Sequence, residues 1–202
     1  MTPDLSDEVR NILDSRFAAR EEAIAGSRKA IRAAANAIRA LHRSDWDDAD
    51  RLITESGSLI ESIDQAVRGH PELWAHAVVF DAAKEYAEAR ITQAVLTGVD
   101  IPDFRTLAVD PVPYLHGLGE AVGEMRRHML DLLRAEKVAE AQRVLDAMDE
   151  IVDTLAQVDY PDGMTNGLRR VTDVSRALVE RSRSDLTATV VQERLRQDLR
   201  DR

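Results

Sequence analysis

The chain has 202 residues, 44% of them hydrophobic and 32% charged, which fits a globular protein with a substantial core. It contains no cysteine, which excludes disulfides, thiolate catalysis and cysteine-ligated zinc and fits a cytoplasmic protein. The formal net charge of −10 argues against indiscriminate binding of nucleic acid over the whole surface. Because there is no uncharged apolar run of about 18 residues and no signal-peptide pattern, we expect no membrane partner.

Apolar residues recur with a helical period along almost the whole chain, so we expect helices and no strand. A first long helix is expected over about 5–42. Ser44 is expected to cap a second helix, which ends near Gly69. Pro71 fits the first turn of a third helix, and Gly98 is expected to end it.

The second half of the chain follows the same period after a proline-containing connection. A fourth helix is expected from about Val112, and a break near 135–137 divides the next stretch into two helices. Residues 164–202 are expected to form two further helices that meet near Ser184. The sequence therefore predicts one all-α domain over residues 1–202, a bundle of six to seven helices.

Three glycines, Gly117, Gly119 and Gly123, fall within the predicted fourth helix. Glycine is unfavourable in a helix interior, because it loses more conformational entropy than other residues. The cluster therefore indicates that another backbone packs closely against this helix, or that a ligand approaches it.

Two pairs of glutamates stand at helical spacing among mostly small or apolar residues. Glu85 and Glu88 are three residues apart. Glu120 and Glu124 are four apart, so each pair projects from one helix face. Four carboxylates that converge from two helices suit a hard divalent cation such as Mg²⁺, with Mn²⁺ as an alternative. Solvated acids or interhelix ion pairs are the other interpretation, because 37 acidic residues in 202 often produce such spacings.

Four stretches of the chain form an ordered set of motifs. Two are short: Arg39-Ala-Leu-His-Arg43 ends the first helix, and Lys84-Glu-Tyr-Ala-Glu-Ala89 lies in the third. The third stretch, 111–126, contains a Tyr-Leu and two Gly-Glu pairs. The fourth runs from Leu168-Arg-Arg to Leu186. In this order and at this spacing, the set resembles the translin family, and within it the branch of translin-associated factor X.

The resemblance implies an all-helical subunit of seven helices that assembles into a hollow octamer and binds single-stranded RNA or DNA. For the factor X branch it also implies a magnesium-dependent endoribonuclease site that faces the interior. The family's acids fall here on Glu85, Glu88 and Glu120, with Glu124 as the acid that follows. Translin itself has an apolar residue at the first position, so Glu85 favours the catalytic branch. The family usually has Asp where this chain has Glu120, and the longer side chain changes the geometry offered to magnesium.

Several cationic residues near these acids are candidates for contacts with RNA phosphates. Arg68 and His70 loosely match a basic cluster of translin, and the others lie within a few helical turns of the glutamates. The candidates are Arg68, His70, His76, Lys84, Arg126 and Arg127. For each of them, a solvated position or an ion pair is the alternative interpretation.

These observations predict a homo-oligomeric, metal-dependent endoribonuclease of single-stranded RNA, with Glu85, Glu88 and Glu120 as catalytic residues. The first alternative is a translin-like protein that binds single-stranded RNA or DNA without cutting it. The second is a helical scaffold protein in which the glutamates form ion pairs between helices.

Overall fold

The computed structural model describes residues 6–200, except for the side chains of residues 74 and 75. Over this range the chain forms seven α-helices and one short 3-10 helix, and it contains no strand. The elements are α1 (Ser6–His42), α2 (Trp46–Val67), η1 (Pro71–Ala75), α3 (Ala77–Thr97), α4 (Pro111–Arg134), α5 (Val138–Ala156), α6 (Asp162–Thr165) and α7 (Leu168–Arg200). The predicted all-α fold is therefore confirmed.

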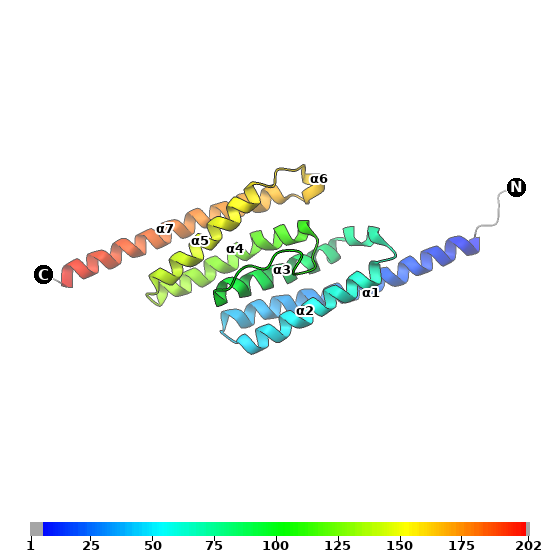
Figure 1. Ribbon diagram of the computed structural model, residues 1–202, viewed down its shortest axis with the longest axis horizontal. Helices are drawn as coiled ribbons and strands as arrows, with labels where there is room; N and C mark the ends of the chain where they lie inside the picture. Colours follow the sequence, from blue (N-terminus) through cyan, green and yellow to red (C-terminus); the bar gives the residue numbers. More distant parts are fainter. Residues whose placement is uncertain (1–5, 201–202) are drawn as a thin grey trace.

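The long helices lie side by side in an elongated bundle (Figure 1). α1 packs against α2 and α3, α3 packs against α4, and α4 packs against α5 and α7. In Figure 1, α3 and α4 lie between the α1–α2 pair on one side and the α5–α7 pair on the other. This order brings the two predicted glutamate pairs onto adjacent helices at the middle of the bundle.

A glycine brings α3 and α4 into close contact. A Cβ atom at Gly117 of α4 would lie 2.9 Å from the Cβ of Ala87 and 2.9 Å from the carbonyl oxygen of Lys84, both on α3. Carbon atoms do not pack at such distances, so only glycine fits here without moving α3. The close backbone packing predicted from the glycines is confirmed at this position.

The other two glycines of α4 differ from each other. A Cβ at Gly119 would meet the side chain of Val171 on α7 at 2.2 Å, so this glycine allows α7 to approach. A Cβ at Gly123 would meet only open space. Close packing is thus confirmed at Gly119 and does not account for Gly123.

Two helix starts differ from the prediction. α3 begins at Ala77 and not at Pro71, because Pro71–Ala75 form a 3-10 turn and His76 is extended. Ser44 does not cap α2. Its φ of 58° places it in the left-handed region, and the backbone N–H groups of Ser44 and Asp45 bond to the last turn of α1. Ser44 therefore ends α1, as a residue after a helix C-terminus does.

The predicted break near Ser184 is wrong, because α7 is continuous from Leu168 to Arg200. Hydroxyl groups on both sides of that point donate to backbone carbonyls four residues earlier, as Ser182 does to Leu178 and Thr187 does to Arg183. These bonds satisfy the polar side chains within the helix, so they do not interrupt it.

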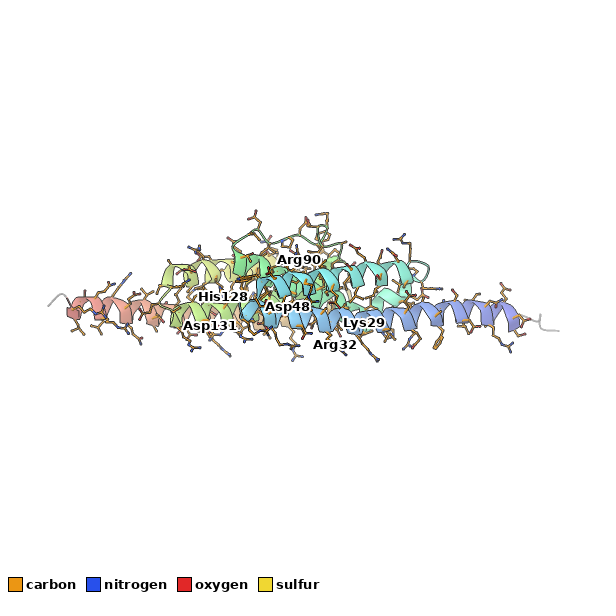
Figure 2. All side chains as sticks on the ribbon, turned by 90° about the horizontal axis from the view of Figure 1, so that it is seen from below. Lys29, Arg32, Asp48, Arg90, His128 and Asp131 are labelled. Carbon is orange, nitrogen blue, oxygen red and sulfur yellow. The ribbon has the colours of Figure 1, made fainter. Side chains whose placement is uncertain are left out.

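α1 and α7 extend beyond the bundle at opposite ends, as Figures 1 and 2 both show. The N-terminal part of α1 and the C-terminal part of α7 carry exposed apolar side chains. They are Val9, Ile12, Leu13 and Phe17 on α1, and Val191, Leu195 and Leu199 on α7. None of the helices that the structure describes is both long and apolar enough for a membrane span.

Candidate metal centre

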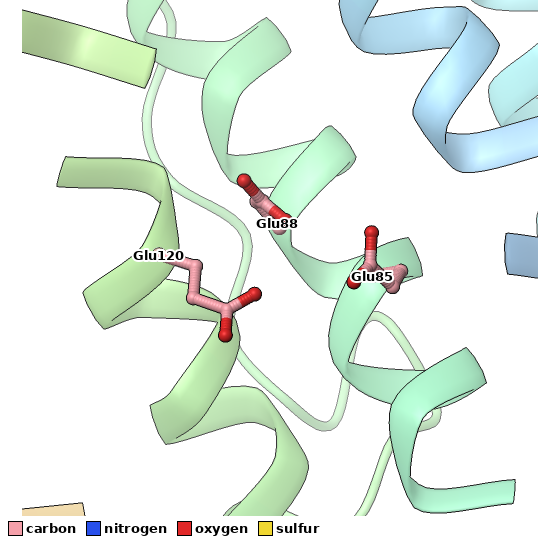
Figure 3. A group of neighbouring side chains, drawn as sticks. All are labelled: Glu85, Glu88 and Glu120. Carbon is pink, nitrogen blue, oxygen red and sulfur yellow. The ribbon is translucent and has the colours of Figure 1, made fainter. Parts of the chain in front are cut away.

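The side chains of Glu85 and Glu88 on α3 and of Glu120 on α4 point toward one another (Figure 3). One carboxylate oxygen from each of the three lies within 4.8 Å of the others. The convergence follows from the sequence, because Glu85 and Glu88 share one face of α3 and Gly117 holds α4 against that face. Three oxygen donors at this separation could hold one divalent cation between the two helices.

Glu88 is the buried member of this cluster, with only 7% of its surface exposed. Burial, together with the nearby negative charges of Glu85, Glu120 and Glu124, raises the pKa of its carboxyl group from 4.5 to about 8. The pKa of Glu85 is also raised, mainly by burial and against the opposing charge of Lys84. The cluster therefore holds more negative charge than its own surroundings neutralise, which is an environment that favours a bound cation.

Lys84 is the cation of the described chain that contacts this cluster directly. Its Nζ lies 2.8 Å from Glu120 and 3.4 Å from Glu85. Burial opposes its charged form, but the hydrogen bond and the charge of Glu120 prevail and raise the pKa of Lys84. Below about pH 8 Glu88 keeps its proton, so this ammonium faces the carboxylates of Glu85 and Glu120, and the balance is still negative. The location of Lys84 beside the acids is a structural finding, and its predicted contact with RNA stays a prediction.

Glu124 lies one turn beyond Glu120 on α4, outside the compact cluster. Its Oε2 accepts a hydrogen bond from Nε2 of His42, the last residue of α1. That bond lowers the pKa of Glu124, although burial acts in the opposite direction. The predicted role of Glu124 as a metal ligand stays a prediction.

The remaining predicted cations lie at varied positions. Arg68 is exposed and pairs with Asp64 on its own helix, and His70 contacts the hydroxyl of Ser15. The buried Nδ1 of His76 has no hydrogen-bond partner among the described residues. The nucleic-acid contacts predicted for these three stay predictions.

Arg126 and Arg127 follow the glutamates on α4 but point to different surroundings. Arg126 donates to Ser182 and Asp185 on α7, at 2.9 and 2.7 Å. Arg127 is exposed, and its charge is close enough to help lower the pKa of Glu124. The RNA contacts predicted for Arg126 and Arg127 stay predictions.

His42 was not among the predicted site residues, although it lies in the Arg39–Arg43 motif. A histidine at a helix end gives no signal of its own, because its partner is 82 residues away. Two exposed cations on α1, Lys29 and Arg32, were also missed (Figure 2). No ion-pair partner is found for either of them within residues 6–200.

Comparison with known proteins agrees with this architecture. The structure of AfC3PO superimposes with a TM-score of 0.84 and is 31% identical in sequence, over 92% of this chain and 97% of the other. The chain belongs to the translin/C3PO family. A second structure of the same C3PO protein, in complex with duplex RNA, gives a TM-score of 0.84 at 30% identity, over 92% of this chain and 96% of the other.

A more distant solved structure shares the fold, and one further protein is similar in sequence. The structure of apo-NeC3PO has a TM-score of 0.81 at 20% identity, over 94% of this chain and 98% of that one. An uncharacterized protein of Methanocaldococcus jannaschii is 28% identical over 193 residues, which cover 94% of this chain and 85% of the relative. No protein-family model matches the chain. The resemblance to the translin family inferred from the motifs is thus confirmed.

Proposed function

We propose that this chain is a metal-dependent endoribonuclease whose centre is formed by Glu85, Glu88 and Glu120. The observation that carries the proposal is the convergence of three carboxylates from two helices, with the buried Glu88 held at a raised pKa of about 8. Close carboxyl groups with raised pKa values cost stability when they ionise without a cation, so this arrangement favours a ligand-binding role. Such groups are concentrated at functional sites.

The donor set fits a magnesium ion, with manganese as an alternative. All three donors are carboxylate oxygens, which hard divalent cations prefer, and magnesium usually takes only a few protein ligands and keeps water on its other positions. When bound, the cation would neutralise the carboxylates and polarise a phosphate oxygen of RNA. The side chain of Glu120 is 38% exposed, so the centre is open to solvent on the α4 side.

The reaction is hydrolysis of an internal phosphodiester of RNA. A water oxygen forms a bond to phosphorus while the bond from phosphorus to one ribose oxygen breaks. That oxygen leaves with the bonding electron pair and is protonated, and the attacking water loses a proton. Glu85, Glu88 and Glu120 would bind the cation. The ammonium of Lys84, beside Glu120, would pair with a phosphate of the bound strand.

RNA is the proposed ligand because a family member 30% identical to this chain has been solved in complex with duplex RNA. Single-stranded RNA is the proposed substrate for cleavage, and duplex RNA belongs in the same test. Exposed cations such as Lys29, Arg32 and Arg127 are available for the backbone, whose phosphates dominate affinity. Single-stranded DNA is the natural comparison ligand, since it lacks the 2′-hydroxyl.

We further propose that the chain works as a homo-oligomer that encloses a cavity, as an octamer. Support comes from the exposed apolar side chains on the projecting ends of α1 and α7, among them Phe17 at 62% and Leu199 at 64% exposure. Contiguous exposed apolar surface is typical of protein–protein contacts. Light scattering of the purified protein gives the number of subunits, and Phe17→Asp is expected to lower it.

A non-catalytic RNA-binding protein is the second candidate. The observation that favours it is the ion pair of Glu120 with Lys84, which occupies an oxygen that a cation would need. Glu120 also stands where the family usually has aspartate.

The test is incubation of purified protein with labelled single-stranded and duplex RNA in Mg²⁺, in Mn²⁺ and in EDTA. Cleavage is expected only with the divalent cations, and the Glu85→Ala/Glu88→Ala variant is expected to bind RNA without cutting it. Glu21→Ala/Glu22→Ala removes two exposed carboxylates from α1 and serves as the matched control. RNA that is bound but intact in every condition would favour the second candidate.

A further inference from the structure

His42 reaches from the end of α1 to α4, two helices that otherwise have little contact. α1 packs against α2 and α3, and α4 packs against α3, α5 and α7. The His42 side chain is nevertheless 4% exposed, and its Nε2 donates to Oε2 of Glu124. A histidine buried at this point is therefore directed at one specific carboxylate.

Glu124 belongs to the surroundings of the glutamate cluster, although it is not one of its three members. It follows Glu120 by one turn, so the two carboxylates project from the same face of α4. The charge of Glu124 is also close enough to contribute to the raised pKa of Glu88. His42 thus holds an acid that is adjacent to two members of the cluster on different helices.

The bond from His42 restricts where the Glu124 carboxylate can lie. A glutamate side chain that is 28% exposed would otherwise sample several rotamers, including ones that turn away from the cluster. Hydrogen-bond partners that orient the carboxylates around a metal ion are known to matter almost as much as the donors themselves. The contact has the form expected of such a partner.

We infer that His42 is a positioning residue for the metal centre: it holds the Glu124 carboxylate at the edge of the Glu85, Glu88 and Glu120 cluster, where the charge of Glu124 adds to the attraction for the cation. This inference rests on the proposed function of the Glu85, Glu88 and Glu120 cluster. It makes the end of α1 part of the centre, and it gives His42 of the Arg39–Arg43 motif a role.

A purely structural His42 would link α1 to α4 and affect only folding. The two roles are separated by manganese binding, measured by electron paramagnetic resonance, together with kcat and KM for RNA cleavage. His42→Ala and Glu124→Gln are each expected to weaken manganese binding and lower kcat by roughly 10- to 100-fold, with little change in KM. Residues that act as one unit are not additive, so the double variant is expected to be no worse than Glu124→Gln.

Two further variants complete the experiment. His42→Gln keeps an N–H donor for Glu124 and is expected to recover part of the lost manganese affinity. Arg39→Ala removes an exposed side chain from the same end of α1 and is expected to bind manganese as the wild type does. Thermal unfolding of each variant shows whether it is folded, and a His42→Ala protein that does not fold leaves the comparison of His42→Gln with Glu124→Gln to decide.

The outcomes distinguish this inference from the proposed function. If Glu88→Gln abolishes manganese binding while His42→Ala and His42→Gln bind and cleave as the wild type does, the role of His42 is wrong and the centre stands. A double variant whose loss equals the product of the two single losses would also overturn it. If Glu88→Gln binds manganese like the wild type, the proposed centre itself fails.

Discussion

Two of the charged contacts that α4 makes with other helices differ in their balance of charge. Toward α7, the guanidinium of Arg126 meets the single carboxylate of Asp185 at 2.7 Å and also bonds to Ser182. Toward α3, Glu120 shares one ammonium, that of Lys84, with Glu85, and the buried Glu88 lies beside them. The first contact satisfies its own charges. The second leaves negative charge in a partly buried place.

The difference indicates which contact exists for the fold and which for a ligand. A balanced, hydrogen-bonded pair can persist without any other molecule. An unbalanced group of carboxylates raises its own pKa values and lowers the stability of the native state, unless a cation binds. The α3–α4 contact is therefore the candidate centre and the α4–α7 contact is a structural tie.

The largest effect is expected from Glu88→Gln. Because the folded-state pKa of about 8 lies above the ordinary 4.5, folded Glu88 keeps a proton that the unfolded chain has released. Its contribution to the free energy of unfolding therefore falls as pH rises from about 4.5 to about 8, by at most about 5 kcal/mol. Urea unfolding without divalent cation should show the variant more stable than the wild type at pH 9 and similar at pH 4.5. Equal stability at both pH values would contradict the raised pKa.

The close contact of α3 with α4 predicts opposite effects for two glycines. Gly117→Ala forces its new Cβ against α3 and is expected to destabilise by roughly 1–3 kcal/mol and to weaken manganese binding. Gly123→Ala meets open space and should stabilise the helix by about 1 kcal/mol. Thermal unfolding of both variants checks this. A destabilised Gly123→Ala would show that another part of the assembly approaches α4 at that point.

The balanced contact predicts a loss that does not depend on metal. Asp185→Asn leaves Arg126 with Ser182 and an uncharged amide, so a loss of about 1 kcal/mol is expected. The loss should be the same in magnesium and in EDTA, as measured by urea unfolding. A metal-dependent loss would mean that the two contacts of α4 are coupled.

Lys84→Met should change metal affinity in a direction opposite to the glutamate variants. The ammonium of Lys84 competes with a metal ion for the carboxylates of Glu85 and Glu120. Without it, manganese is expected to bind about fivefold more tightly, an effect on the order of 1 kcal/mol. Titration of manganese into the variant and the wild type measures the shift. Weaker binding would indicate that Lys84 orients the carboxylates and does not compete with the cation.

The sequence predicted the parts of this picture that depend on local pattern. The helical period was enough for the all-α fold and for the boundaries of α1 and α4. The spacings of Glu85 with Glu88 and of Glu120 with Glu124, together with the resemblance to the translin family, were enough to predict that acids from two helices converge. Local pattern failed at Ser184, because Ser182 and Thr187 donate to backbone carbonyls of their own helix and α7 stays continuous through this polar stretch.

Contacts between distant segments could not be predicted. Nothing near His42 in the sequence indicates that it meets Glu124, and nothing near Arg126 indicates Asp185. Both partners depend on how whole helices pack, which a hydrophobic period does not specify. The raised pKa of Glu88 likewise depends on its burial. The spacing of acidic residues does not predict burial, because the same spacing occurs on solvated helices.

The most direct test of the central claim is the number of manganese ions bound per subunit, measured by electron paramagnetic resonance at pH 8. The wild type is predicted to bind at least one ion per subunit, and the Glu85→Ala/Glu88→Ala variant is predicted to lose it while remaining folded. Equal binding by the two proteins would contradict the claim that the α3–α4 contact is a metal centre.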